Sequence, residues 1–383
     1  MFNDAHFLMN LLGKAGFETR IAGGAVRDML LGETPKDIDL ATIATPDEVV
    51  TMLKKNHIGY VDSENARKHG TITAIVNHVP FEITTLRIDK TTDGRHAEVE
   101  FVTDWEVDAS RRDFTINAMF MDKEQVVYDY FTGKEDIETK LIRFVGNADE
   151  RIKEDYLRIL RFYRFVARFD SATESMGKKH DTEDHRACLD LLKNLKSISK
   201  ERIWTELCKI FYYKTESSKR IIHLLWGVGF EDVFNDGLCM FPNFPINCEH
   251  AASAYWGCFG TRFMDIMPLS REEKFISDKL QYLSKTANIK SLQDIALLVA
   301  FHGHDIVKEF LQVAWWGPER ELLSKLGGLP YDSFPVSGQD LLDMGIPAGK
   351  RMGEILKELK IIWAKTIFKA DKDFLLAKVP ELI

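Results

Sequence analysis

Short apolar runs rich in β-branched residues alternate with polar segments over the first third of the chain. Runs of this kind, bounded by turn residues, are typical of β-strands. The pattern predicts strands at Thr19–Ala22, Ile38–Ile43, Thr71–Val76, Phe81–Thr85 and Glu98–Val102. Asn77 and His78, between two of these runs, predict a hairpin turn. Residues 1–16 predict an amphipathic helix, and Thr45–Glu48 predicts the start of another, with proline in its first turn.

From about Ile142 a helical period replaces the strand pattern. Glu154–Phe165 shows it most clearly, because its apolar positions recur at helical spacing. Almost all of the remaining chain is predicted to be helical, with polar breaks at residues 170–184, 241–245 and 327–335. The pattern therefore predicts a mixed α/β domain followed by a longer all-helical part.

Composition limits the possible classes of protein. The chain has 383 residues, enough for two to four domains. Its net charge of −8 argues against a general nucleic-acid binder, although a local basic strip would be enough to contact phosphates. Five cysteines without a C-x-x-C pair indicate a reduced intracellular protein with no zinc site. No apolar run is long enough for a bilayer and no targeting signal begins the chain, so no membrane association is expected.

Two aspartates one residue apart, Asp37 and Asp39, are the first candidates for chemistry. Because alternate residues of a strand point to the same face, the predicted strand would place both carboxylates side by side. Such a pair suits hard cations such as Mg²⁺, and two Mg²⁺ ions catalyse in-line nucleotidyl transfer. We therefore predict that Asp37 and Asp39 are catalytic metal ligands.

A glycine pair precedes these aspartates. Gly23 and Gly24 follow a predicted strand and open a predicted helix that contains Arg27. Glycine lets the backbone approach a triphosphate, the helix N-terminus favours its charge, and Arg27 would bind a phosphate oxygen. The alternative is an ordinary strand–helix connection with a surface arginine.

A second cluster spans Arg111–Ala118. Arg111 and Arg112 can reach phosphate oxygens, whereas Asp113 and Asn117 suit a ribose hydroxyl or can hold the arginines in place. The alternative is a helix start that happens to carry charges.

A third cluster contains Asp155 and Arg158, which would be i,i+3 neighbours on one helix. An aspartate that accepts from an amino group, beside an arginine that donates to a ring nitrogen, matches the pairing edges of cytosine and adenine. Guanine and uracil would set acceptor against acceptor at the aspartate and donor against donor at the arginine. Each lost hydrogen bond would weaken binding by about 1–3 kcal/mol. The alternative is an intrahelical ion pair. Arg161 and Arg164 continue the row and are assigned to phosphate, ribose or support of the template.

The order of the glycine pair and the Asp-x-Asp motif resembles polymerase-β-type nucleotidyltransferases. In that superfamily a third carboxylate comes from a neighbouring strand, which makes Glu82 the candidate here, with a solvent-facing strand residue as the alternative. All three clusters together, with Glu201–Glu206, resemble the class II CCA-adding enzymes of the poly(A) polymerase/CCA transferase family. Residues 87–98 are similar to the flexible loop of the animal mitochondrial branch.

The resemblance implies an α+β protein with a polymerase-β-type head and a mixed sheet. It implies a head at residues 1–140, a neck with the base template at 141–205, a helical body at 206–328 and a tRNA-binding helical tail at 329–383. It also implies two Mg²⁺ ions at Asp37 and Asp39, with Glu82 as the third catalytic candidate. The residues expected around the nucleotide are Gly24, Arg27, Arg111, Arg112, Asp113, Asn117, Asp155, Arg158, Arg161 and Arg164.

The implied reaction is the stepwise addition of C, C and A to the 3′ end of tRNA from CTP and ATP, with release of pyrophosphate. A bacterial-type poly(A) polymerase and an inactive tRNA-binding protein are the alternatives. We further expect a monomer or weak homodimer, located in mitochondria, with the cytoplasm and nucleus as alternative compartments.

Overall fold

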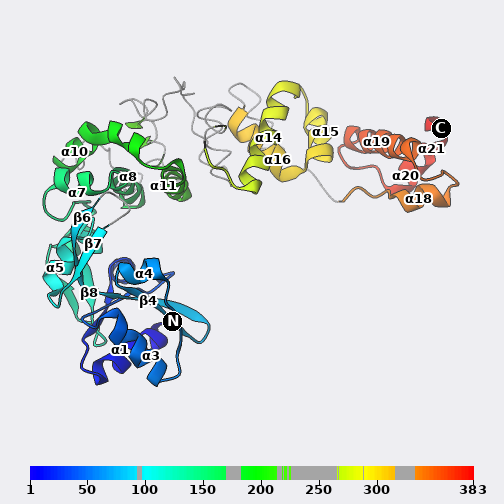
Figure 1. Cartoon of the computed structure of the whole chain (residues 1–383). Coiled ribbons are helices and arrows are strands. Elements are labelled where there is room, and N and C mark those ends of the chain that lie inside the picture. Colours follow the sequence, from blue (N-terminus) through cyan, green and yellow to red (C-terminus); the bar gives the residue numbers. More distant parts are fainter. Residues whose placement is uncertain are drawn as a thin grey trace. The chain divides into compact units, whose positions relative to one another are not determined.

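A computed structural model describes residues 1–92, 97–169, 183–213, 218, 220–221, 224–225, 265, 267–287, 289–314 and 333–383 (Figure 1). Its contacts divide the chain into two units, Met1–Asp236 and Gly237–Ile383. The finer division into four domains stays a prediction.

A seven-stranded mixed sheet organises the N-terminal part of the first unit, with strand order β3-β4-β5-β2-β1-β8-β9. Strands β2 and β5 are parallel, whereas the other neighbouring pairs are antiparallel. The strands are β1 (Thr19–Ala22), β2 (Leu40–Thr42), β3 (Gly59–Val61), β4 (Thr71–Val76), β5 (Val79–Thr85), β8 (Met119–Met121) and β9 (Val127–Asp129). The predicted mixed sheet is confirmed.

A separate hairpin lies beside this sheet. It consists of β6 (Arg87–Thr92) and β7 (Ala97–Phe101), which pair antiparallel. The family resemblance implied a flexible loop over residues 87–98, whereas β6 occupies Arg87–Thr92 of this segment. The three-residue strands β3, β8 and β9 were not predicted either, because each is too short to show a period of two.

Turns and caps of the head follow the local chemistry of the sequence. Asn77 and His78 join β4 to β5 and both adopt positive φ angles, 51° and 63°, as a tight hairpin turn requires. Thr45 and Glu48 form a reciprocal capping box at the start of α3. The head helices are α1 (Phe2–Lys14), α2 (Gly24–Leu30), α3 (Pro46–Lys55), α4 (Glu64–Lys68), α5 (Trp105–Ser110), the 3-10 helix η1 (Thr115–Asn117) and α6 (Gly133–Thr139).

Helices follow the sheet within the first unit. They are α7 (Ala148–Glu154), α8 (Arg158–Phe169), α10 (Glu183–Leu191), the 3-10 helix η2 (Leu192–Ser197) and α11 (Lys200–Tyr212). Phe114, from the second sequence cluster, packs against Phe144 at 4.8 Å and against Phe165 of α8 at 5.4 Å. Phe144 in turn stacks on Phe162 of α8 at 5.9 Å. These buried rings fix the second cluster against α8, and burial of aromatic side chains supplies much of a core's stability.

The secondary-structure elements described for the second unit are all helices, as predicted. The helices are α14 (Arg271–Thr286), α15 (Leu292–His302), α16 (His304–Ala314), α18 (Gly338–Asp343), α19 (Lys350–Lys365), α20 (Lys372–Ala377) and α21 (Val379–Leu382). The predicted break at 241–245 lies outside the described residues, as do residues 327–332 of the predicted break at 327–335 and residues 170–182 of that at 170–184. Across the described ranges, no helix has the length and apolar character needed to cross a membrane.

Candidate active site

The two aspartates lie in a loop rather than in a strand. Strand β2 begins at Leu40, so Asp37 and Asp39 come just before it. The predicted strand over Ile38–Ile43 is therefore wrong at its start. Of the two aspartates, only Asp39 extends the pairing of β2 with β1, because its carbonyl accepts a hydrogen bond from the backbone N–H of Ala22 at 2.9 Å.

Glu82 lies next to this pair. The parallel register aligns Leu40 of β2 with Ile83 of β5, which places Asp39 beside Glu82 one position earlier. Although Asp39 is exposed overall, desolvation of its carboxyl group, followed by repulsion from Glu82 and Asp37, raises the pKa of Asp39 to about 6. A divalent cation would relieve this repulsion, so the donor set fits Mg²⁺. Within the described ranges, no three His, Cys, Asp or Glu side chains are already arranged around a common metal position.

The loop that carries the aspartates is attached to the following helices. Arg168 of α8 forms ion pairs with Asp28 at 2.8 Å and with Glu33 at 2.6 Å. The Lys36 ammonium lies 4.8 Å from the ring centroid of Tyr212 in α11. Helices that come more than 100 residues later in the sequence therefore hold the loop from α2 to β2 in place.

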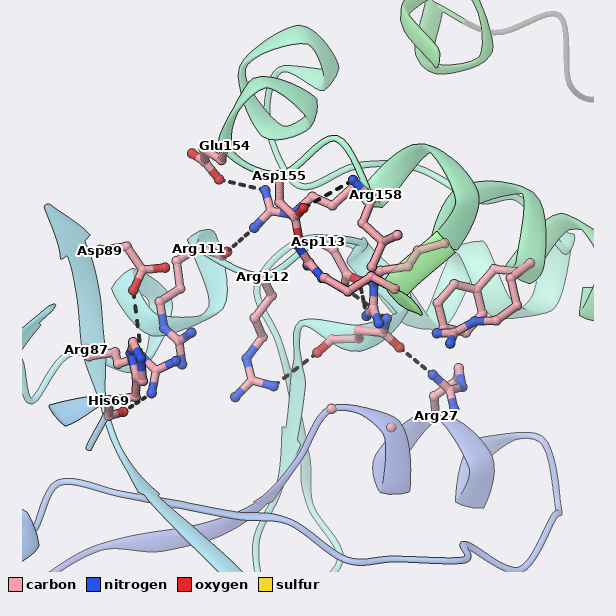
Figure 2. A pocket seen from close by; sticks show the side chains of 18 residues that line it. Arg27, His69, Arg87, Asp89, Arg111, Arg112, Asp113, Glu154, Asp155 and Arg158 are labelled. Atoms are coloured by element: carbon pink, nitrogen blue, oxygen red, sulfur yellow. Dashed lines mark hydrogen bonds and ion pairs between the residues drawn. The ribbon is translucent and has the colours of Figure 1, made fainter. Parts of the chain in front are cut away.

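A polar cavity of about 550 Å³ is lined by residues of α2, the second sequence cluster and α8 (Figure 2). All ten residues predicted to surround the nucleotide line it: Gly24, Arg27, Arg111, Arg112, Asp113, Asn117, Asp155, Arg158, Arg161 and Arg164. Asp37, Asp39 and Glu82 are not part of the lining. Arg112 links the two groups, because it lines the cavity and its charge also acts on Asp39.

Gly23 of the glycine pair also lines the cavity, and seven further residues of the lining were not predicted: His69, Arg87, Asp89, Glu154, Leu157, Phe165 and Arg202. Arg87 and Asp89 belong to the segment that resembles a flexible loop, and Arg202 belongs to the Glu201–Glu206 motif, so motif membership was an available signal. Each arginine of the lining forms an ion pair with a carboxylate. The guanidinium groups are therefore oriented by the protein itself.

The first glycine of the pair makes room for one of these arginines. Gly23 has φ 63° and ψ −115°, a conformation that side chains disfavour. A Cβ atom there would lie 2.8 Å from Nη1 of Arg112 and 3.3 Å from the carbonyl oxygen of Asn117. Position 23 therefore requires glycine because of both its backbone angle and the arginine beside it.

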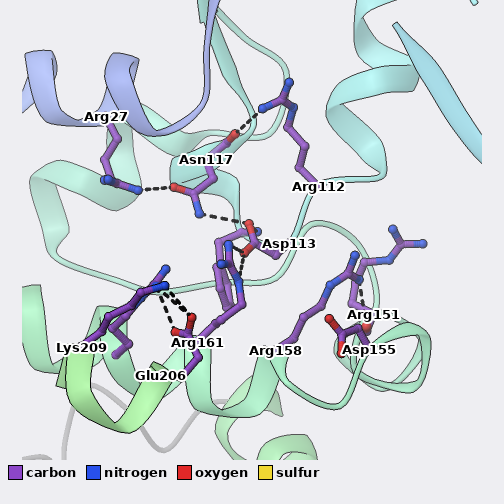
Figure 3. Close-up of polar contacts among 12 residues, drawn as sticks. Arg27, Arg112, Asp113, Asn117, Arg151, Asp155, Arg158, Arg161, Glu206 and Lys209 are labelled. Atoms are coloured by element: carbon purple, nitrogen blue, oxygen red, sulfur yellow. Dashed lines mark hydrogen bonds and ion pairs between the residues drawn. The ribbon is translucent and has the colours of Figure 1, made fainter. Parts of the chain in front are cut away.

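A chain of hydrogen bonds connects α2 to α8 across the cavity (Figure 3). Nη1 of Arg27 donates to Oδ1 of Asn117 at 2.5 Å, and Nδ2 of Asn117 donates to Oδ1 of Asp113 at 3.0 Å. Nε of Arg161 donates to Oδ2 of Asp113 at 2.7 Å. Burial would raise the pKa of Asp113, but Arg161 and the Asn117 amide outweigh it and lower the pKa to about 2. The side chains of Asp113 and Asn117 thus hold Arg161 and Arg27 in place rather than the arginines of their own cluster. Their predicted contact with a ribose hydroxyl stays a prediction.

Asp155 and Arg158 lie on either side of a break between two helices. Helix α7 ends at Glu154, Asp155 is extended at φ −155° and ψ 104°, and α8 begins at Arg158. The predicted i,i+3 pair on one helix is therefore wrong. Oδ1 of Asp155 instead accepts from the backbone N–H of Leu157 at 3.1 Å. Short acidic side chains favour such local backbone bonds over helix continuation.

These two residues have other partners. Oδ2 of Asp155 accepts from Nη2 of Arg202 in α11 at 2.7 Å. Nη1 of Arg158 donates to Glu154 at 2.6 Å and to the carbonyl of Arg151 at 2.8 Å. Because both residues still line the cavity, a carboxylate and a guanidinium face the same space.

Helix α11 also forms an ion pair with α8 itself. Arg164 lies 2.9 Å from the buried Glu206, which also accepts from Lys209 at 3.0 Å. With the pair between Arg202 and Asp155, two residues of the Glu201–Glu206 motif therefore support the residues of the third cluster.

Comparison with known proteins defines the class first. The family model of the poly A polymerase head domain matches residues 19–143. The mitochondrial CCA tRNA nucleotidyltransferase 1 of Mus musculus is 37% identical, over 97% of this chain and 88% of the relative. The human protein of the same name is 38% identical over the same shares. The chain belongs to the family of CCA tRNA nucleotidyltransferases and is an enzyme of this type.

Solved structures agree with this assignment. The CCA-adding enzyme of Bacillus stearothermophilus in complex with CTP has a TM-score of 0.69 and 25% identity, over 99% of this chain and 97% of that one. The Thermotoga maritima CCA-adding enzyme complexed with tRNA has a TM-score of 0.70 over 100% of this chain and 95% of that one, and at 18% identity it supports the fold alone.

Proposed function

We propose that this enzyme adds C, C and A to the 3′ end of tRNA from CTP and ATP and releases pyrophosphate. The observation that carries the proposal is the cavity lined by eight arginines, with a carboxylate–guanidinium pair in its wall and an acidic loop beside it. Arginines suit a triphosphate, and the pair suits a base that offers one amino donor and one ring acceptor.

The acidic loop supports the metal part of the proposal. Asp37 and Asp39, with Glu82 beside them, would hold two Mg²⁺ ions, which when bound lower the pKa of the primer hydroxyl and stabilise the leaving pyrophosphate. These carboxylates repel one another, and the repulsion contributes to the raised pKa of Asp39. A bound cation would relieve it, which supports this assignment. The chain's own residues then have the tasks of holding the triphosphate and selecting the base.

Arg27, Arg111 and Arg112 would hold the triphosphate. Nη1 and Nη2 of Arg27 and the Arg112 side chain are already fixed by Asn117, Asp28 and Asp108. Donors that do not have to reorganise when charge develops are the more effective ones in catalysis.

Asp155 and Arg158 would select the base. The carboxylate accepts from the amino group of cytosine or adenine, and the guanidinium donates to the ring acceptor. Arg202 and the Leu157 N–H hold the Asp155 carboxylate, whereas Nη2 of Arg158 has only a long contact of 3.5 Å to the Arg111 carbonyl. That nitrogen therefore has capacity to donate to a base.

We propose tRNA as the partner and mitochondria as the compartment, since the relatives named above carry both in their names. The helical tail at residues 329–383 is proposed to contribute to tRNA binding. Oligomeric state plays no part in the proposed mechanism.

The test uses a tRNA that lacks its 3′ end, incubated with CTP, ATP or both and resolved at single nucleotides. We expect two cytidines with CTP, no addition with ATP alone, and C, C and A with both. A long adenosine tail from ATP alone would indicate a poly(A) polymerase instead, and no incorporation would indicate an inactive tRNA-binding protein. Asp37→Ala is the matched control and should abolish incorporation while tRNA binding persists.

A further inference from the structure

A buried carboxylate that does not line the cavity holds two of the arginines that do. Asp108 lies in α5 and is 1% exposed. Its Oδ1 accepts from Nε of Arg111 at 2.8 Å and from the backbone N–H of Arg87 at 3.1 Å. Its Oδ2 accepts from Nε and Nη2 of Arg112 at 3.3 Å and 3.1 Å. Both oxygens are thus used, and every donor comes from a residue of the cavity lining.

The charge of this group is retained despite its burial. Burial would raise the pKa of Asp108, but the guanidinium groups of Arg112 and Arg111 outweigh it and lower the pKa. An isolated buried carboxylate would be strongly unfavourable, and these partners offset that penalty. Asp108 is therefore an anion. It and the two arginines hold one another in position.

Arg112 occupies a central place in the site. Apart from Asp108, its guanidinium makes a long hydrogen bond of 3.4 Å to the carbonyl of Asn117 and lies 4.8 Å from the Phe120 ring centroid. Nη1 lies over Gly23, and its charge acts on Asp39. Without Asp108, this guanidinium would keep only weak directional contacts among those described.

Asp108 also anchors the hairpin β6–β7 at its first residue, Arg87. The Arg87 guanidinium donates to the carbonyl of His69 and lies 3.7 Å from Asp89. One carboxylate thus connects the start of the hairpin with the two arginines, which Figure 2 shows on neighbouring parts of the cavity wall.

We propose that Asp108 is a positioning residue that directs Arg111 and Arg112 toward the triphosphate of the bound nucleotide. This inference rests on the proposed role of the cavity as the nucleotide site. Asp108 itself touches no substrate. It acts by keeping the donors in their binding orientation before the nucleotide arrives.

The direct test compares ligands that differ only in their phosphates. Asp108→Asn keeps the shape of the side chain but removes its charge and one acceptor. We expect the affinity for CTP to fall about 10–100-fold, the range for lost hydrogen bonds to charged groups, while the affinity for cytidine monophosphate changes less than about threefold. An equal loss for both ligands would mean a merely structural role, and no loss for either would overturn the proposal.

The matched control is Asp136→Asn. Asp136 is also 1% exposed and pairs with an arginine, Arg143, at 2.7 Å, but neither residue lines the cavity. It should lose stability without changing the ratio of CTP to cytidine monophosphate affinity. If Asp108→Asn does not fold, Asp108→Glu keeps the charge and displaces it by one methylene group, and it should show the same triphosphate-specific loss.

A mutant cycle tests whether Asp108 acts through the arginines. Added to Arg111→Gln/Arg112→Gln, the change Asp108→Asn should cost less than about twofold in CTP affinity. A full additional loss in that background would overturn the proposal. If the wild type and the Asp108→Asn variant both incorporate CTP normally, this inference is rejected and the proposed function stays intact.

Discussion

Two aspartates of the cavity, Asp113 and Asp155, have similar partners but different surroundings. Asp113 accepts from Arg161, Asn117 and the Phe114 N–H, and its side chain is 9% exposed. Asp155 accepts from Arg202 and a backbone N–H, and its side chain is 22% exposed. The carboxylate oxygens of Asp113 are occupied by donors of the protein, whereas the Asp155 carboxylate stays accessible from the cavity. We infer that the Asp113 side of the cavity maintains geometry and the Asp155 side contacts the changing base.

The largest expected effect on stability follows from removal of the buried partner. Asp113→Ala leaves Arg161 and Asn117 without their acceptor, and breaking such a pair costs about 3–5 kcal/mol. We expect the lower end of this range, because the Arg161 side chain is 31% exposed. Chemical unfolding followed by tryptophan fluorescence measures the change. Asp155→Ala is the control at less than about 1 kcal/mol, and equal losses would remove the distinction between the two sides.

The pH dependence of stability sharpens the same contrast. The pKa of Asp113 in the folded protein is about 2, below its ordinary value of 3.8. The stabilisation is therefore present above pH 4 and lost as the pH falls through the folded-state pKa, with a size of about 2 kcal/mol. The difference in unfolding free energy between wild type and Asp113→Asn should shrink between pH 5 and pH 2. A difference that stays constant over this interval would contradict the paired, ionised state.

Base selection should depend on the more open aspartate. Asp155→Ala removes the acceptor for the amino group, so the preference for CTP over UTP should fall about 10–100-fold. Single-turnover incorporation into a tRNA that lacks its 3′ end measures this preference. Asp149→Ala, an exposed carboxylate in the first turn of α7, is the control and should leave selection unchanged. Unaltered selection in Asp155→Ala would refute the template role.

The smallest effect is expected from the partner on α11. Arg202→Ala leaves Asp155 with only the Leu157 N–H, so selection should weaken about 2–5-fold, the range for a partly exposed ion pair. Combined with Asp155→Ala it should add nothing. A further loss in the double variant would mean that Arg202 contacts the nucleotide independently.

Much of the site could be predicted from the sequence. The three clusters supplied ten nucleotide-site residues, and the fold brings all ten to one cavity. None of the three patterns is specific alone, and each has an ordinary structural alternative. Their order along one chain resembles a known family, and that order carried the prediction. The metal roles of Asp37, Asp39 and Glu82 stay predictions, supported by the register of β2 and β5.

The errors have physical reasons as well. A helical period continues through residues 154–158, but Asp155 bonds to the Leu157 N–H and ends the helix, which a period alone does not show. Its partner Arg202 comes 47 residues later, so only tertiary structure could identify it. Asp108 stands three and four residues before Arg111 and Arg112, a spacing that exposed helical ion pairs share. Its burial and its bond to the Arg87 N–H of β6 are tertiary features that this spacing does not show.

The absence of a side chain at Gly23 has an evolutionary consequence. A methyl group there would lie 2.8 Å from Nη1 of Arg112, which would have to shift, and 3.3 Å from the carbonyl oxygen of Asn117. The positive φ angle of Gly23 would oppose a side chain even where Arg112 moved aside. A change at position 112 alone therefore does not open position 23 to other residues, and the turn constrains the enzyme's history as much as its shape.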